Sequence, residues 1–184
     1  MTTKPKLMTA EELLLLPDDD MKRELIRGVL TEDMPPGYEH GVVEFRIGRL
    51  IGNFAEENDF GEVLGGDSGF ILERGPDTVR GPDVAWVAPG RVEGRVRGFA
   101  ELAPDLVVEV RSPSDSQRHM AERAMMWLSH GVRMALVADP QSVTLTVYRP
   151  GEPPQVLGEF DTFDGGDVLP GFTTPVWSFF RRRE

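Results

Sequence analysis

The 184-residue sequence has no cysteine, no long apolar run and only 3 lysines among its 20 basic residues. Without cysteine, disulfide bonds and thiolate metal ligands are excluded. The longest apolar run near the N-terminus, Leu13 to Leu16, is too short for a signal-peptide core or a membrane span. We therefore expect a cytoplasmic protein with no membrane segment.

Excess positive charge is also missing, since the formal net charge is −11. Proteins that coat nucleic acid bind largely by neutralising phosphates, so this charge argues against such a role. The charge is uneven along the chain, however. Residues 91–133 contain 7 arginines and 6 acidic residues, which leaves a local basic face possible.

Length and composition indicate one soluble globular domain spanning residues 1–184. The chain is 40% hydrophobic and 28% charged, which is ordinary for a folded protein. A chain of this length can bury a substantial core but is too short for two domains of usual size. No internal repeat or low-complexity segment interrupts it.

Hydrophobic periodicity predicts the N-terminal elements. Thr9 and Glu12 have the spacing of a capping box, which predicts a short helix over residues 10–16. The segment "RELIRGVLTEDM" has two apolar-bearing arms around Gly28 and predicts a hairpin. Apolar residues recur at helical spacing over residues 39–58, which predicts a long amphipathic helix.

The rest of the chain predicts short strands around one more helix. Strand-like pieces at residues 61–66, 69–74 and 79–89 are followed by a strand over 105–111. Ser114 or Asp115 could cap a helix ending near Ser129, and strands follow at 133–139 and 143–150. Strand, helix and strand in this order predict an α/β (α+β) fold with a mixed sheet. The apolar segment 167–180 is expected to pack on the core.

Two acidic residues lie in or next to strands that are predicted to be buried. Side chains alternate along a strand, so Val107, Glu109 and Arg111 share one face of the strand over 105–111. Asp83 in "GPDVAWV" lies at the entry to another strand. Two such carboxylates repel each other unless positive charge lies between them, and Mg²⁺ commonly supplies it at oxygen-ligand sites. We therefore predict a metal held by Asp83 and Glu109.

The segments "GPDV", "PDLVVEVRSPSD", "WLSHGVRMALVADP" and "DVLPGF" occur in the order seen in a known family. Together with "RELIRGVL" and "EHGVV", they make nearly the whole chain resemble the Uma-type restriction endonucleases of the PD-(D/E)XK nuclease superfamily. The resemblance implies a restriction-endonuclease-like core with a mixed β-sheet and flanking helices. It also implies an Mg²⁺- or Mn²⁺-dependent nuclease site.

The resemblance also implies roles for individual residues. Asp83 and Glu109 would hold the metal, Glu24 of "RELIRG" would complete the acidic cluster, and His40 of "EHGVV" would contact the substrate. The superfamily has a lysine two residues after the glutamate or on the following helix, where this chain has Arg111 and Arg123. Arginine stays charged at any relevant pH, so it could stabilise charge on the phosphate but could not accept a proton.

Each candidate also has a purely structural interpretation. Glu109 could form an ion pair with an arginine, and Asp83 could bind backbone N–H groups in a turn. Glu24 lies among basic residues and could be a solvated ion pair. Arg123 could pack its stem over a tryptophan, and His40 could be a hydrogen-bonded structural residue.

Two functional hypotheses from different classes follow. The first is a homodimeric, metal-dependent endonuclease acting on DNA, with a two-fold axis suited to cutting both strands. The second is a homodimeric binding or accessory protein that keeps the nuclease fold without its activity; the missing lysine and the charge of −11 favour it. Hydrolysis of a smaller phosphodiester is a further alternative, because an acidic protein would accept it more readily than long DNA.

Overall fold

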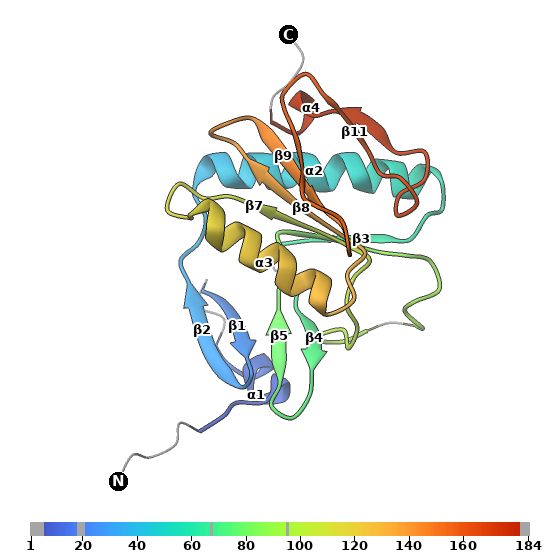
Figure 1. The fold of residues 1–184 in the computed structure, drawn as a ribbon. Coiled ribbons are helices and arrows are strands. Elements are labelled where there is room, and N and C mark those ends of the chain that lie inside the picture. Colours follow the sequence, from blue (N-terminus) through green and yellow to red (C-terminus); the bar gives the residue numbers. More distant parts are fainter. Residues whose placement is uncertain (1–5, 18–20, 67, 95, 181–184) are drawn as a thin grey trace.

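A computed structural model describes residues 6–17, 21–66, 68–94 and 96–180, whose strands form three sheets flanked by helices (Figure 1). The helices are α1 (Ala10–Leu14), α2 (Tyr38–Glu57), α3 (Gln117–Ser129) and α4 (Trp177–Phe180). The central strands are β3 (Glu62–Gly65), β6 (Val84–Val87), β7 (Leu106–Val110), β8 (Met134–Asp139), β9 (Thr144–Tyr148) and β10 (Gln155–Leu157). The second sheet contains β1 (Lys22–Ile26), β2 (Val29–Asp33), β4 (Phe70–Glu73) and β5 (Thr78–Arg80).

The central sheet has the order β10-β9-β8-β7-β6-β3. Strands β7 and β8 are parallel, and the other neighbours are antiparallel. Helix α3 connects the parallel pair, because a parallel connection must cross over the sheet. In Figure 1, α2 lies on one side of this sheet and α3 on the other. The predicted mixed sheet with flanking helices is thus confirmed.

Strand β7 is buried along its whole length, and its side chains alternate between the two faces of the sheet. Leu106, Val108 and Val110 join the core beneath α2. Val107 joins the core beneath α3. Alternation places Glu109 on the same face as Val107, so its carboxyl group points toward α3.

The two long helices pack by the periodicity seen in the sequence. Helix α2 buries residues three or four apart, and its predicted span of 39–58 is within one residue of the observed one at each end. Helix α3 buries Met120, Ala124 and Trp127 against the opposite face. Ser116 caps it by accepting a hydrogen bond from the His119 N–H, so the expected cap at Ser114 or Asp115 was wrong. Residues 112–115 form a turn before the helix begins, with the Asp115 N–H donating to the Ser112 carbonyl, so the cap follows this turn.

The second sheet has the order β2-β1-β5-β4 and joins the N-terminal segment to the strand that precedes Asp83. Strands β1 and β2 form the predicted hairpin, with Arg27 and Gly28 at positive φ in its turn. Leu25 pairs with Val79, which fixes β1 beside β5. Helix α1 carries the predicted capping box but ends two residues earlier than expected.

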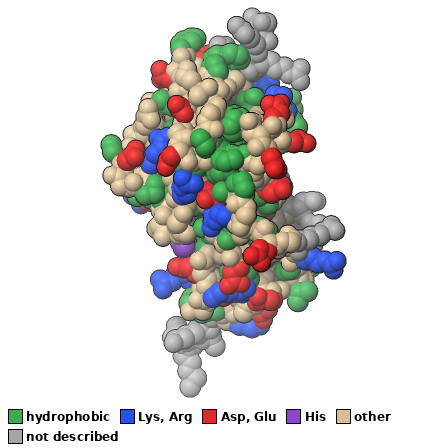
Figure 2. All heavy atoms as spheres, turned by 90° about the vertical axis from the view of Figure 1, so that its right-hand side faces the viewer, with side chains coloured by type: hydrophobic (Ala, Val, Ile, Leu, Met, Phe, Trp, Pro, Cys, Tyr) green, Lys and Arg blue, Asp and Glu red, His purple; other side chains and the backbone are tan. Residues whose placement is uncertain are grey.

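The C-terminal segment closes the core on the α2 side. Strands β11 (Thr162–Asp164) and β12 (Thr173–Pro175) form a small sheet. Phe163, Phe172 and Phe179 are buried in the same core as α2, and the last two belong to the apolar segment 167–180 that was expected to pack there. Acidic and basic side chains are interspersed on the face shown in Figure 2. Within the described ranges, no helix is both long and apolar enough to span a membrane.

Candidate active site

A cleft of about 540 Å³ opens where β1, the N-terminal end of α2, the entry to β6, the end of β7 and α3 meet. Its lining includes Lys22, His40, Glu44, Asp83, Glu109 and Arg123. Asp83 and Glu109 therefore converge on one cavity although 26 positions separate them in the chain.

Asp83 is buried and is held by three donors from different elements. Its Oδ2 accepts a hydrogen bond of 2.6 Å from the Val110 N–H, which ties the entry of β6 to the end of β7. His40 Nε2 lies 3.2 Å from the same oxygen, and Lys22 Nζ lies 3.4 Å from Oδ1. Burial opposes ionisation, but the hydrogen bond from His40 and the positive charge of Lys22 hold the pKa of Asp83 below its usual value.

Glu109 is buried on the α3 side of the sheet. Both Trp127 Nε1, at 2.6 Å, and Arg123 Nη2, at 3.0 Å, donate to its Oε1 atom. Burial raises the pKa of Glu109 above its usual value, and the charge of Asp83 adds to this effect, although Arg123 opposes it. The pKa values of the two acids are therefore pushed in opposite directions, a pattern typical of sites that move protons.

Arg123 joins two of the predicted acids. Besides Glu109, its guanidinium group lies 3.5 Å from Glu24 Oε2. Burial works against its charge, but Glu109 and Glu24 outweigh burial and raise the pKa of Arg123, so the group remains cationic. Arg123 thus supplies positive charge to the cleft from the chain itself, as the structural interpretation of Glu109 also expected.

Glu24 lies at the back of this cluster and is almost fully buried. One carboxylate oxygen accepts a hydrogen bond of 2.9 Å from the Gly81 N–H, and the other lies 3.1 Å from Arg80 Nε. Glu24 therefore contacts Arg80 and Arg123, rather than forming the solvated ion pair that its neighbours in sequence indicated.

His40 and Glu44 extend the site toward α2. They are one helical turn apart, with His40 Nδ1 3.7 Å from Glu44 Oε2. Ligand atoms of His40, Glu44 and Asp83 lie within 4.8 Å of one another, as a bound metal ion would require. Nδ1 of His40 is buried and makes no hydrogen bond within the described structure. A buried imidazole between two carboxylates, with one nitrogen that makes no hydrogen bond, fits a nitrogen-and-oxygen metal site.

The carboxylates beside His40 also set its charge in the metal-free protein. Burial lowers the pKa of His40, but the hydrogen bond with Asp83 and the nearby Glu44 carboxylate outweigh it and raise this pKa to about 9. His40 is therefore a cation at neutral pH and balances Asp83. A metal ligand must be neutral imidazole, so metal binding would release this proton.

Arg111 lies apart from the other predicted residues. Strand β7 ends at Val110, and the Arg111 side chain forms an ion pair of 2.7 Å with Asp139 at the end of β8. Its Nε also donates to the Asp115 carbonyl. Arg111 is not among the described residues that line the cleft.

Two cleft residues had no role in the sequence prediction. Glu44 follows His40 by four positions, and this spacing on a helix puts two ligands on one face, so the signal was present. Lys22 gave no comparable signal, because its contact with Asp83 spans 61 positions and depends on the pairing of β1 with β5.

Comparisons with known proteins identify the family and the fold. The Uma2 family, described as "Putative restriction endonuclease", matches residues 10–177. The crystal structure of a "putative nuclease belonging to DUF820" from Anabaena variabilis superposes with a TM-score of 0.78 and 22% identity, covering 94% of this chain and 97% of that one. This likeness confirms the restriction-endonuclease-like fold. A search of curated proteins found no match.

Proposed function

The chain belongs to the Uma2 family, and from this premise we propose that it is an Mg²⁺- or Mn²⁺-dependent endonuclease that hydrolyses phosphodiester bonds in DNA. The observation that carries the proposal is the convergence of Asp83 and Glu109 on one open cleft beside His40 and Glu44. Oxygen ligands with one imidazole are a donor set that suits Mn²⁺ and is compatible with Mg²⁺.

The residues present fit a dication. Asp83 would be its central ligand, with His40 and Glu44 on the α2 side. Both donors to Glu109 reach Oε1, so we expect Oε2 to face the ion. A bound Mg²⁺ or Mn²⁺ supplies a Lewis acid and lowers the pKa of a coordinated water.

The chain's own groups would then orient and stabilise the reacting phosphate. Arg123 keeps its charge, so it cannot take a proton but can offset negative charge that develops on phosphate oxygens. Trp127 and Arg123 fix the orientation of Glu109 by holding one of its oxygens. The cleft is open, as access by a nucleic acid strand requires.

The proposal extends to assembly and location. Cutting both strands of a duplex favours two-fold symmetry, so we propose a homodimer. We also propose that the protein acts in the cytoplasm, where it would encounter its DNA substrate.

One observation favours a second function. Arg123 occupies space beside Glu109, and Glu109 and Asp83 already contact cations of the chain. Ion pairs of this kind would also hold the site together in a homodimeric binding or accessory protein that has lost cleavage.

Plasmid nicking separates the two functions. We expect wild-type protein to nick supercoiled DNA with Mn²⁺ or Mg²⁺ and to lose this activity with EDTA. Glu109→Gln should abolish nicking, while Glu122→Gln on the exposed side of α3 should not change it. A folded wild type that binds DNA but leaves it intact with either ion would favour the accessory protein.

A further inference from the structure

The cleft contains a lysine that does not come from the motif. The motif positions hold Arg111 and Arg123, and Arg111 is turned toward Asp139. Lys22, at the start of β1, places its ammonium nitrogen 3.4 Å from Asp83 Oδ1, and its side chain is only 14% exposed. Among the described residues lining the cleft, Lys22 is the one lysine.

Strand pairing brings Lys22 to this position. Leu25 of β1 pairs with Val79 of β5 in antiparallel register. Because the strands are antiparallel, the start of β1 lies toward the end of β5, and Lys22 reaches Asp83 just beyond that end. The same strand delivers Glu24 to Arg80 and Arg123, so β1 contributes one acid and one cation to the site.

Lys22 and Arg123 are not equivalent cations. Arg123 is held between two buried carboxylates, Glu109 and Glu24. Moving it away would take one cation from each of two buried carboxylates, which is strongly unfavourable. Lys22 contacts Asp83 at 3.4 Å through a compact ammonium group on a flexible four-carbon stem, whereas the guanidinium group of Arg123 is a rigid planar fork. The flexible stem of Lys22 allows its ammonium group to turn from Asp83 toward an anionic group bound in the cleft.

We propose that Lys22 is a substrate-contacting residue of this site, with its ammonium group donating to a non-bridging oxygen of the phosphate that is cleaved. This proposal rests on the proposed nuclease function. The ammonium group exchanges one anionic oxygen, Asp83 Oδ1, for another on the phosphate.

The step balances without further reagents. The water oxygen forms a bond to phosphorus while the bond from phosphorus to the leaving oxygen breaks. The leaving oxygen keeps the electron pair and takes a proton from solvent, and the attacking water loses its proton to solvent. Lys22 keeps its own proton and stabilises the charge that builds up on the non-bridging oxygen.

A salt titration of DNA binding tests the contact independently of cleavage. Fluorescence anisotropy with a short labelled duplex in Ca²⁺ would be repeated over a series of salt concentrations, with the duplex checked on a gel. Loss of one phosphate contact lowers the slope of log K against log salt by about 1. We expect this decrease for Lys22→Met and not for Lys22→Arg, which retains the charge.

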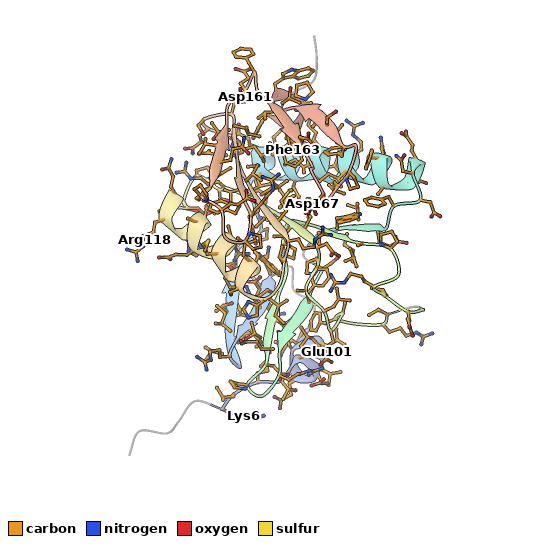
Figure 3. The ribbon with its side chains drawn as sticks, turned by 45° about the vertical axis from the view of Figure 1, so that its right-hand side comes forward. Lys6, Glu101, Arg118, Asp161, Phe163 and Asp167 are labelled. Atoms are coloured by element: carbon orange, nitrogen blue, oxygen red, sulfur yellow. The ribbon has the colours of Figure 1, made fainter. Side chains whose placement is uncertain are left out.

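Lys6→Met is the matched control. Lys6 is also a lysine that pairs with a carboxylate, Glu12, but its side chain is 84% exposed and lies near the N-terminal end of the molecule (Figure 3). Its salt slope and turnover should match wild type. In Mn²⁺, we expect kcat of Lys22→Met to fall about 100- to 1000-fold, the usual effect of losing one donor to a developing oxyanion.

The outcomes separate this inference from the nuclease proposal. A wild type that binds the duplex but never cleaves would refute the nuclease, while the salt slopes would still decide the Lys22 contact. Equal slopes for Lys22→Met and Lys6→Met would overturn the inference even if the wild type cleaves. Wild-type protein that does not bind DNA would overturn both. If circular dichroism shows that Lys22→Met is unfolded, the salt slope of Lys22→Gln would be compared with that of Lys6→Met instead.

Discussion

Arg123 Nη2 donates to Glu109 Oε1 across 3.0 Å and so connects α3 to the centre of the sheet. The same guanidinium group approaches Glu24 on β1, which belongs to the other main sheet. One side chain therefore links α3 to the neighbouring strand β7 and to β1, which is distant in sequence. Its positive charge lies beside two buried carboxyl groups and joins the elements that form the walls of the cleft.

Replacing Arg123 by methionine should destabilise the protein strongly. The substitution preserves much of the apolar stem but leaves Glu109 and Glu24 without this partner. Breaking a buried ion pair by removing one member lowers the free energy of unfolding by about 3–5 kcal/mol. Urea denaturation measures this change.

Arg118→Met is the control on the same helix. Among the residues that the structure describes, Arg118 pairs with Glu122 alone, and it projects away from the body of the molecule (Figure 3). Exposed pairs of this spacing contribute about 0.5 kcal/mol or less. Similar losses for the two variants would show that Arg123 is not the link described above.

Replacing Trp127 by phenylalanine should test the second donor to Glu109. Phenylalanine fills much of the same buried space but cannot donate to Oε1. A hydrogen bond to a charged group contributes about 1.5–3 kcal/mol, so we expect a loss of free energy of unfolding in that range. Unchanged urea unfolding would mean that Glu109 is satisfied without the indole.

His40 should make stability decrease at alkaline pH. Its pKa is about 9 in the folded protein and 6.5 in an unfolded chain, so the folded state holds the proton more tightly. The resulting stabilisation is fully present below pH 6.5 and is lost as pH rises through 9. Urea unfolding between pH 6 and 10, without metal, should show this decrease.

His40→Gln should flatten that pH dependence, because glutamine does not titrate. His119→Gln is the control, since His119 is exposed on α3. If wild type and His40→Gln lose stability in parallel between pH 6.5 and 9, the buried pair of His40 with Asp83 is not the cause.

Glu44 should contribute to metal affinity although the sequence motif does not include it. We expect Mn²⁺ to bind more tightly than Mg²⁺, because imidazole nitrogen suits Mn²⁺ better. Glu44→Gln should weaken Mn²⁺ binding by about 10-fold or more. Losing a group that only orients a metal ligand typically weakens binding by about 10-fold, and losing a ligand should cost at least as much. Isothermal titration calorimetry of the metal-free protein measures both affinities.

Glu122→Gln removes a carboxylate from an exposed position and serves as the control for net charge. If both glutamine variants bind Mn²⁺ with the same affinity as wild type, the ion does not contact Glu44. A site formed by Asp83 and Glu109 alone would then be the better description.

Patterns among residues close in sequence were sufficient to predict several of the helices, strands and turns. Helical spacing predicted α2, alternation predicted that Glu109 would face away from Val108 and Val110, and the turn at Gly28 predicted the β1–β2 hairpin. These features depend on interactions between residues close in sequence, or on the burial of one face. For the same reason, the strand entry at Asp83 could be recognised from its own neighbours.

Only the tertiary structure decided which charged side chains meet. Arg111 would have shared the face of Glu109 had the strand continued, but β7 ends one residue earlier and Asp139 attracts its guanidinium group. Lys22 reaches Asp83 because β1 pairs with β5, a contact between distant segments that no local pattern encodes. Sequence periodicity determines which face of an element is buried, whereas the partners of a buried charge depend on how separate elements pack.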